Sequence, residues 1–164
     1  MTSRLARGVS GALLTAMLAL AGCGSSDEGG ADSFIGQWQY TSGTSSTQCP
    51  MVGVNSITQL QGQKEVFARG VGSALINSDP NSNCILNFNV MGTTATAPAG
   101  QACQTTVNTD SGPIPTTITL VSAVFVVTGT TARFSQSANF TLNVNGSSIQ
   151  CMITGSGDLL RISQ

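Results

Sequence analysis

The sequence predicts an all-β domain, an antiparallel up-and-down barrel of about eight to ten strands, with a β-sandwich as the alternative. Three observations favour this class. Apolar and polar residues alternate over short runs, and turn residues separate these runs at intervals of about 8–15 residues. No segment beyond residue 33 has the apolar period of about 3.6 residues that is typical of a helix. Charged residues make up only 8% of the chain, so Ser, Thr, Asn and Gln must provide most of the solvated surface.

The first segment has the pattern of an export signal. Arg4 and Arg7 precede an apolar run over residues 11–20, and small residues then lead to Cys23. The order of charge, apolar run and small residues is typical of secretion, and the run is shorter than the about 20 apolar residues of a membrane span. The sequence Leu-Ala-Gly-Cys at residues 20–23 resembles the lipobox of bacterial lipoprotein signals. This resemblance implies that residues 1–22 are a lipoprotein signal peptide and that the thiol of Cys23 carries a lipid.

The lipidated cysteine is followed by a predicted flexible tether. Residues 23–32 are small, polar and acidic, with nothing to bury. Gly24 stands where a retention signal would place Asp, so the resemblance implies the outer membrane of the cell envelope as the destination. Two of the six basic residues precede Cys23 and all seven acidic residues follow it. The weakly acidic remainder excludes nucleic acid as a partner, and we expect a monomer whose link to the membrane is the lipid.

Residues 33–164 form the predicted β-barrel domain, which opens with Gly36-Gln-Trp38 and has Arg161 near its end. In these residues the chain resembles lipocalin-like barrels. The resemblance implies that Gly36, Trp38 and Arg161 close the barrel, with the arginine lying across the indole in a cation–π contact of about 0.5–2 kcal/mol. The Thr-Asp-Tyr segment and long C-terminal helix of lipocalins are absent. The alternatives are a Trp38 that only fills the core and an Arg161 whose head points into solvent. As a whole the chain also resembles small β-rich lipoproteins of Gram-negative bacteria, which implies no activity.

The clearest predicted hairpin has its turn at Asn145-Gly146. Asn-Gly between alternating runs favours a two-residue turn, because both central residues must adopt positive φ. Such a turn pairs Leu142 with Ile149 and Phe140 with Cys151. The apolar residues of both strands then share one face of the sheet, so the turn and the hydrophobic pattern predict the same register.

A second hairpin is predicted at Met91-Gly92, where residues 84–90 alternate in polarity and residues 93–97 return. The other segments expected to be extended are residues 34–41, 53–60, 65–71, 74–77, 116–128 and 132–138. Turn residues around positions 80, 112 and 129 separate several of them. Residues 121–127 are apolar on both faces, which is expected of a strand buried on two sides or needing a partner.

Four cysteines remain after Cys23, namely Cys49, Cys84, Cys103 and Cys151. An even number in an exported domain predicts two disulfides. Three pairings are possible, and the sequence alone does not choose among them. We favour Cys84–Cys103 as a local bond across the base of the second hairpin, and Cys49–Cys151 as a bond between the first and last strands of a closed sheet. A metal site is disfavoured because the chain has no His and no Cys-x-x-Cys pair.

The sequence favours a non-catalytic protein without a cofactor. The absence of histidine excludes His-dependent triads and zinc hydrolases of the His-Glu type. Lys64 and Glu65 are expected to be a solvated pair in a loop. The other acidic residues of the domain, Asp79, Asp110 and Asp158, are expected in turns as well.

Two functions remain. In the first, the barrel interior binds a small hydrophobic ligand near the membrane, since a barrel of about eight strands has room for one. In the alternative, the domain is a structural or adhesion module with a filled core. The size of the inward-facing residues favours the alternative, because together they could fill a small barrel: Trp38, Leu86, Phe88, Phe140, Leu142 and Ile149.

Overall fold

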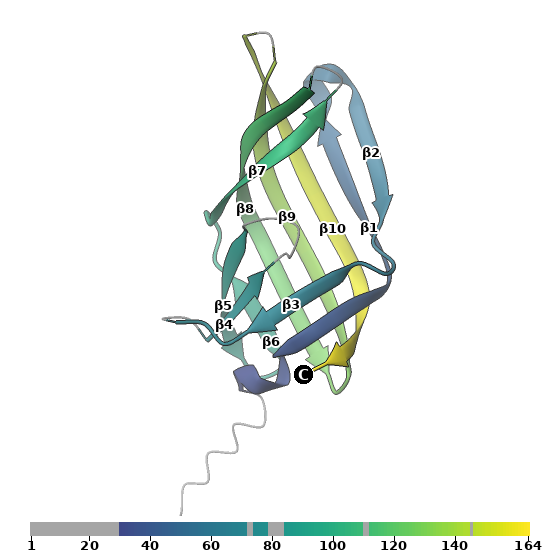
Figure 1. Cartoon of the computed structure of the whole chain (residues 1–164), viewed down its shortest axis with the longest axis vertical. Helices are drawn as coiled ribbons and strands as arrows, with labels where there is room; N and C mark the ends of the chain where they lie inside the picture. Colours follow the sequence, from purple (N-terminus) through teal and green to yellow (C-terminus); the bar gives the residue numbers. More distant parts are fainter. Residues whose placement is uncertain (1–29, 72–73, 79–83, 110–111, 145) are drawn as a thin grey trace, which may run out of the picture.

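The computed structural model describes residues 30–71, 74–78, 84–109, 112–144 and 146–164 (Figure 1). Within these residues the chain forms antiparallel strands and two short 3-10 helices, so the predicted all-β class is confirmed. The helices are η1 (Ala31–Ser33) and η2 (Pro50–Val52). The strands are β1 (Gly36–Cys49), β2 (Val54–Gln59), β3 (Lys64–Ala68), β4 (Leu75–Ser78), β5 (Ile85–Met91), β6 (Thr94–Ala97), β7 (Ala102–Thr109), β8 (Gly112–Thr128), β9 (Thr131–Val144) and β10 (Ser147–Ser163). The predicted signal, Cys23 and the tether as far as residue 29 lie outside the described residues.

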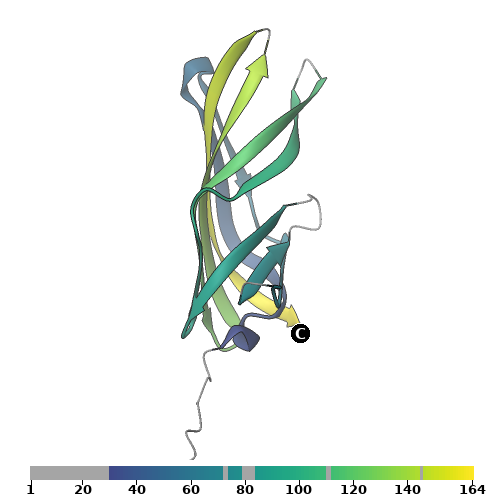
Figure 2. The ribbon, with the colours of Figure 1, turned by 90° about the vertical axis from the view of Figure 1, so that its left-hand side faces the viewer.

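The strands form a barrel-like ring that is closed at one end and open at the other. Pairing runs in the order β1-β3-β4-β5-β6-β8-β9-β10, and β10 pairs with β1 to complete the ring. The ring encloses the end near η1 and the C-terminus (Figure 1). At the far end, β2 pairs only with β1 and β7 only with β8, so both are edge strands there. Figure 2 shows the β7–β8 hairpin diverging from the β9–β10 hairpin toward this open end.

The register of the predicted Asn-Gly hairpin is confirmed. Leu142 is opposite Ile149 and Phe140 is opposite Cys151 on β9 and β10. Both strands extend well beyond the predicted segments, since β9 is one continuous strand and β10 continues to Ser163. The additional length of β10 pairs with β1, whose Ser- and Thr-rich second half is also a strand. Backbone hydrogen bonds between β1 and β10 stabilise these segments, although their side chains do not alternate between apolar and polar. The hydrophobic pattern alone therefore predicted strands that were too short.

For the strand over residues 121–127, the first of the two predicted alternatives, burial on two sides, is wrong. It belongs to β8, which has partners along both edges but only one buried face. Phe125 is fully buried, whereas Val121 and Val126 are exposed. A bulge between Leu120 and Ser122 interrupts the alternation at the start of this segment. The double-sided apolar pattern therefore reflects an exposed apolar outer face and not burial on two sides.

The closed end is filled by aromatic side chains. The Phe67 and Phe125 rings stack with their centroids 4.2 Å apart, and the Trp38 ring meets Phe125 edge-on at 5.2 Å. Six aromatic residues are fully buried there: Phe34, Trp38, Phe67, Phe88, Phe125 and Phe134. A second, smaller cluster lies toward the open end around Cys49, Phe140 and Cys151. Leu142 and Ile149 only pack against this cluster and are partly buried, because the β7–β8 hairpin diverges from the β9–β10 hairpin there.

Both disulfides follow the pairing that the sequence favoured. Cys49 at the end of β1 is bonded to Cys151 on β10, and Cys84 before β5 is bonded to Cys103 on β7. Their Cα atoms are 4.2 Å and 5.0 Å apart. The strand pairings of the described residues, their aromatic core and both disulfides lie within residues 30–164. This segment therefore contains the interactions that hold the fold together, and it is the segment used in the experiments proposed below.

Candidate binding cavity

A cavity of about 200 Å³ lies between the two hydrophobic clusters. Leu86 and Leu120 belong to the aromatic cluster of the closed end, and Ile118 and Ile153 pack against the cluster of the open end. The remaining walls come from the Cys84–Cys103 disulfide and from polar or small residues: Glu65, Asn77, Gln101, Thr105, Gln136 and Ala138. An apolar cavity of about 150 Å³ is enough to take up benzene. The cavity is therefore large enough for the ring or chain of a small organic molecule.

Glu65 lies in this cavity and not in a loop, so its sequence-based prediction is wrong. β3 begins at Lys64, and its alternation places Glu65 on the same face as the buried Phe67. Lys64 is exposed. The strand begins early because the turn before it is bonded to β1: the Tyr40 amide donates to the Gln63 carbonyl at 2.9 Å. Glu65 is two residues before the buried Phe67. This period of two residues could have predicted that the Glu65 side chain faces the interior.

Two side chains donate hydrogen bonds to the Glu65 carboxylate. Asn77 Nδ2 donates to Oε2 at 2.9 Å, and Tyr40 Oη donates to Oε1 at 3.4 Å. Asn77 is buried on β4 and also donates to the carbonyl of Val66. Burial raises the pKa of the Tyr40 hydroxyl, and the negative charge of Glu65 raises it further. Tyr40 therefore remains a neutral donor, which suits an ionised carboxylate because that group can only accept hydrogen bonds.

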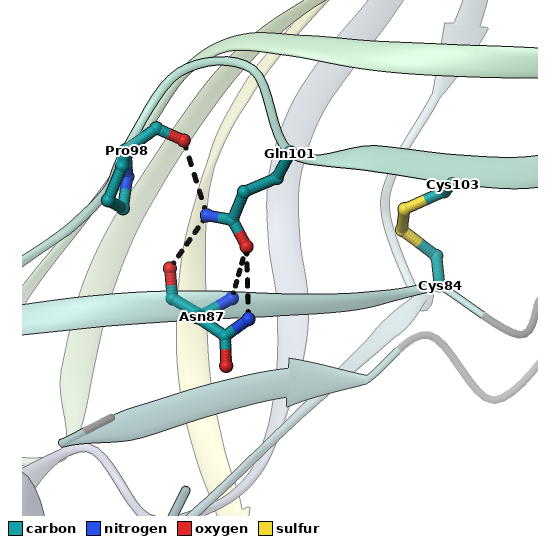
Figure 3. The surroundings of a disulfide bond; sticks show 5 residues. All are labelled: Cys84, Asn87, Pro98, Gln101 and Cys103. Carbon is teal, nitrogen blue, oxygen red and sulfur yellow. Dashed lines mark hydrogen bonds between the residues drawn. A yellow bond between two sulfur atoms is a disulfide. The ribbon is translucent and has the colours of Figure 1, made fainter. Parts of the chain in front are cut away.

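Between β5 and β7, the Gln101 side chain takes the place of a backbone hydrogen-bond partner (Figure 3). Gln101 Oε1 accepts a hydrogen bond from the Asn87 amide at 2.7 Å, and Gln101 Nε2 donates to the Asn87 carbonyl at 2.9 Å. Nε2 also donates to the Pro98 carbonyl at 3.2 Å. β6 has ended at Ala97 at this point, so the carboxamide replaces a backbone partner for β5. The Cys84–Cys103 disulfide makes a second link between the start of β5 and β7 (Figure 3).

The predicted closure residues Gly36, Trp38 and Arg161 come together at the closed end. Trp38 is opposite Arg161 in the β1–β10 pairing, and the guanidinium carbon lies 4.5 Å from the centre of the indole. The Arg161 head also donates to the Ser33 carbonyl, and burial lowers the pKa of its guanidinium. The alternative in which this head points into solvent is therefore wrong. A Cβ on Gly36, whose φ is +129°, would collide with the Ser163 carbonyl.

Asp158 also differs from its prediction as a turn residue. It lies on β10 with an exposed side chain, which forms an ion pair with Arg133 at 3.8 Å. Ser42 donates a hydrogen bond to the same carboxylate at 3.2 Å. Asp79 and Asp110 lie outside the described residues. Within the described ranges, no group of three or more His, Cys, Asp or Glu side chains could hold a metal ion.

Comparison with known proteins gives no match to this chain among protein-family models, curated proteins or solved structures. No helix in the described part of the chain is long and apolar enough to cross a membrane.

Proposed function

We propose that the chain is an outer-membrane lipoprotein whose β-domain, without catalysing a reaction, binds a small and largely apolar ligand in the cavity. The observation that carries this proposal is a cavity of about 200 Å³, lined by Leu, Ile and Ala side chains together with a few polar ones, next to an end that is already filled. Because the aromatic cluster fills the closed end, a ligand would bind in the cavity beside it.

The lipid on Cys23 would supply the location for this function. The predicted tether is short enough to keep the domain beside the membrane, since η1 already begins at Ala31 and a flexible chain of about seven residues would span on the order of 13–16 Å. A domain held there could receive an apolar molecule from the lipid phase.

This part of the proposal rests on the lipobox at residues 20–23. It predicts that labelled palmitate is incorporated into the full chain in bacterial cells and that Cys23→Ser abolishes the incorporation; an unlabelled wild-type chain would contradict it.

Ligand binding can be tested with residues 30–164, produced with both disulfides oxidised. The probe is N-phenyl-1-naphthylamine, a neutral apolar dye whose fluorescence rises when it leaves water. We expect saturable binding that Ala138→Trp abolishes, because Ala138 on β9 lines the cavity. Asn139→Trp is the matched control, since the neighbouring side chain is exposed. Equal binding by the two variants, or no saturable binding by the wild type, would contradict the proposal.

The alternative of a structural or adhesion module is supported by the filled aromatic end, in which six aromatic residues are fully buried. Its tightly packed side chains leave no room for a ligand at this end of the molecule. The same titration separates the two functions, because a filled structural module gives no saturable signal with the apolar probe.

A further inference from the structure

We propose that the ligand of this cavity is an organic cation, a small amphiphile whose protonated amine binds the Glu65 carboxylate. This inference rests on the proposed function and specifies its ligand class. The amine would lie beside Glu65 and Asn77, and the apolar part would lie along Leu120, Ala138 and Ile153.

The charge of the cavity comes from a single residue. Among the described residues that line it, Glu65 is the only ionisable side chain, because Cys84 and Cys103 are joined in a disulfide. Apolar walls lower the local dielectric, so a fixed charge acts more strongly there than on the surface. A cationic headgroup is therefore favoured, and an anionic headgroup such as that of a fatty acid is repelled.

The position of Glu65 is fixed by its neighbours. The hydrogen bonds from Tyr40 Oη and Asn77 Nδ2 reach different carboxylate oxygens and hold the group in one orientation. Tyr40 and Asn77 are both buried. A preorganised acceptor of this kind costs little ordering on binding, which favours affinity for a donor that meets it.

The arrangement of the walls orients the ligand. Glu65 is opposite Trp38 on β1, and Asn77 is opposite Phe67 on β3, so both polar groups belong to the closed end. Ile118 and Ile153 pack against the cluster of the open end. An ammonium group would therefore point toward the closed end and an apolar tail toward the opening. Gln136 on β9 lines the cavity from a different wall and could donate or accept a further hydrogen bond.

The test compares three ligands of equal chain length: octylamine, octanol and octanoate. Each is used to displace N-phenyl-1-naphthylamine from residues 30–164 at neutral pH. A hydrogen bond to a charged group corresponds to about a tenfold to hundredfold change in affinity. We expect octylamine to compete at least about tenfold better than octanol, and octanoate to compete least well.

Substitutions then assign the preference to Glu65. Glu65→Gln should retain binding of the neutral dye and lose the advantage of octylamine over octanol. Asp158→Asn is the matched control, because this carboxylate is exposed on β10 and paired with Arg133; it should keep the advantage. Gln136→Lys places a cation in the cavity wall and should favour octanoate. This variant keeps the inference testable even if Glu65→Gln does not fold.

The two proposals fail in different ways. If the wild type binds the dye but does not prefer octylamine, the ligand class is wrong and the binding function stands. The same conclusion follows if the preference persists in Glu65→Gln, or in Gln136→Lys when the Glu65 variant does not fold. If the folded wild type binds neither the dye nor octylamine, the binding function itself is wrong.

Discussion

The guanidinium carbon of Arg161 lies 4.5 Å from the centre of the Trp38 indole, across the pairing that closes the ring. Trp38 Nε1 donates to the Phe34 carbonyl at 2.8 Å, and the Arg161 head donates to the Ser33 carbonyl. The first strand, the last strand and the chain that enters from η1 are therefore held together at one point. This contact lies at the closed end of the molecule, and the cavity lies on the other side of the aromatic core.

Removal of the arginine should measure the stability that this closure provides. We expect Arg161→Ala to lower the free energy of unfolding of residues 30–164 by about 1–3 kcal/mol, because it removes both the cation–π contact and a charged hydrogen bond. Arg161→Lys should recover part of the loss, since Lys keeps the charge but lacks the planar group that stacks on the indole. Urea unfolding followed by Trp38 fluorescence measures both effects. Arg133→Ala is the control, because its ion pair with Asp158 is exposed; an equal loss there would contradict the role of Arg161.

The two disulfides should contribute unequally. Cys49 and Cys151 are 102 residues apart in sequence, whereas Cys84 and Cys103 are 19 apart. In the chain-entropy model, loops of these lengths correspond to about 4.7 and about 3 kcal/mol of stabilisation. The double substitution Cys49→Ser/Cys151→Ser should therefore lower the urea midpoint more than Cys84→Ser/Cys103→Ser. The reverse order would show that the unfolded-chain entropy does not dominate the effect of these bonds.

The Gln101 carboxamide should be more important than an ordinary surface amide. Gln101→Ala removes hydrogen bonds to the Asn87 and Pro98 backbone, and we expect a loss of about 1–2 kcal/mol in unfolding free energy. Gln104→Ala, which removes one exposed bond to Thr117, should change stability by less than about 0.5 kcal/mol. Hydrogen exchange provides a second measurement, since the Asn87 amide should lose its protection only in the Gln101 variant. Retained protection there would contradict the strand-like role of this side chain.

Stability should fall at alkaline pH because of Tyr40. Burial raises the pKa of this hydroxyl in the folded protein, whereas an unfolded chain has an ordinary value of about 10. Below that pH both states keep the proton and the group has no effect on the pH dependence. Above it only the unfolded state releases the proton, so the free energy of unfolding should fall by about 1.4 kcal/mol per pH unit.

The pH effect can be assigned directly, because Tyr40 is the only tyrosine in the chain. Phenolate absorbance at 295 nm should appear together with unfolding and not before it. Tyr40→Phe should remove this component of the pH dependence. A phenolate that forms in the folded protein near pH 10 would contradict the buried position and the hydrogen bond to Glu65.

The sequence predicted the features that depend on local pattern. The Asn-Gly turn specifies the register of β9 and β10, and the alternation around Phe140 confirms it independently. The pairing of Cys49 with Cys151 followed from a single assumption, closure of the sheet. The resemblance also predicted correctly that Arg161 lies across the Trp38 indole, where β1 pairs with β10.

Features that depend on non-local pairing were missed. The second half of β1 is rich in Ser and Thr and has no hydrophobic alternation, so only its pairing with β10 and β2 reveals it as a strand. The position of Glu65 after Lys64 and a turn predicts a solvated side chain, although the two-residue period from Phe67 predicts one that faces inward. Nothing near Gln101 in the sequence indicates that its side chain would meet Asn87, because that contact exists only where β6 has ended.

The most direct test of the cavity as a ligand site is a titration of ¹⁵N-labelled residues 30–164 with octylamine, followed by amide chemical shifts. We expect saturable shifts concentrated on residues that line the cavity, including Glu65, Leu86, Leu120 and Ile153. Amides of exposed apolar residues on the outer face, such as Met91 and Val126, should not move. Shifts that are absent from the cavity, or that gather on the exposed apolar residues, would contradict it.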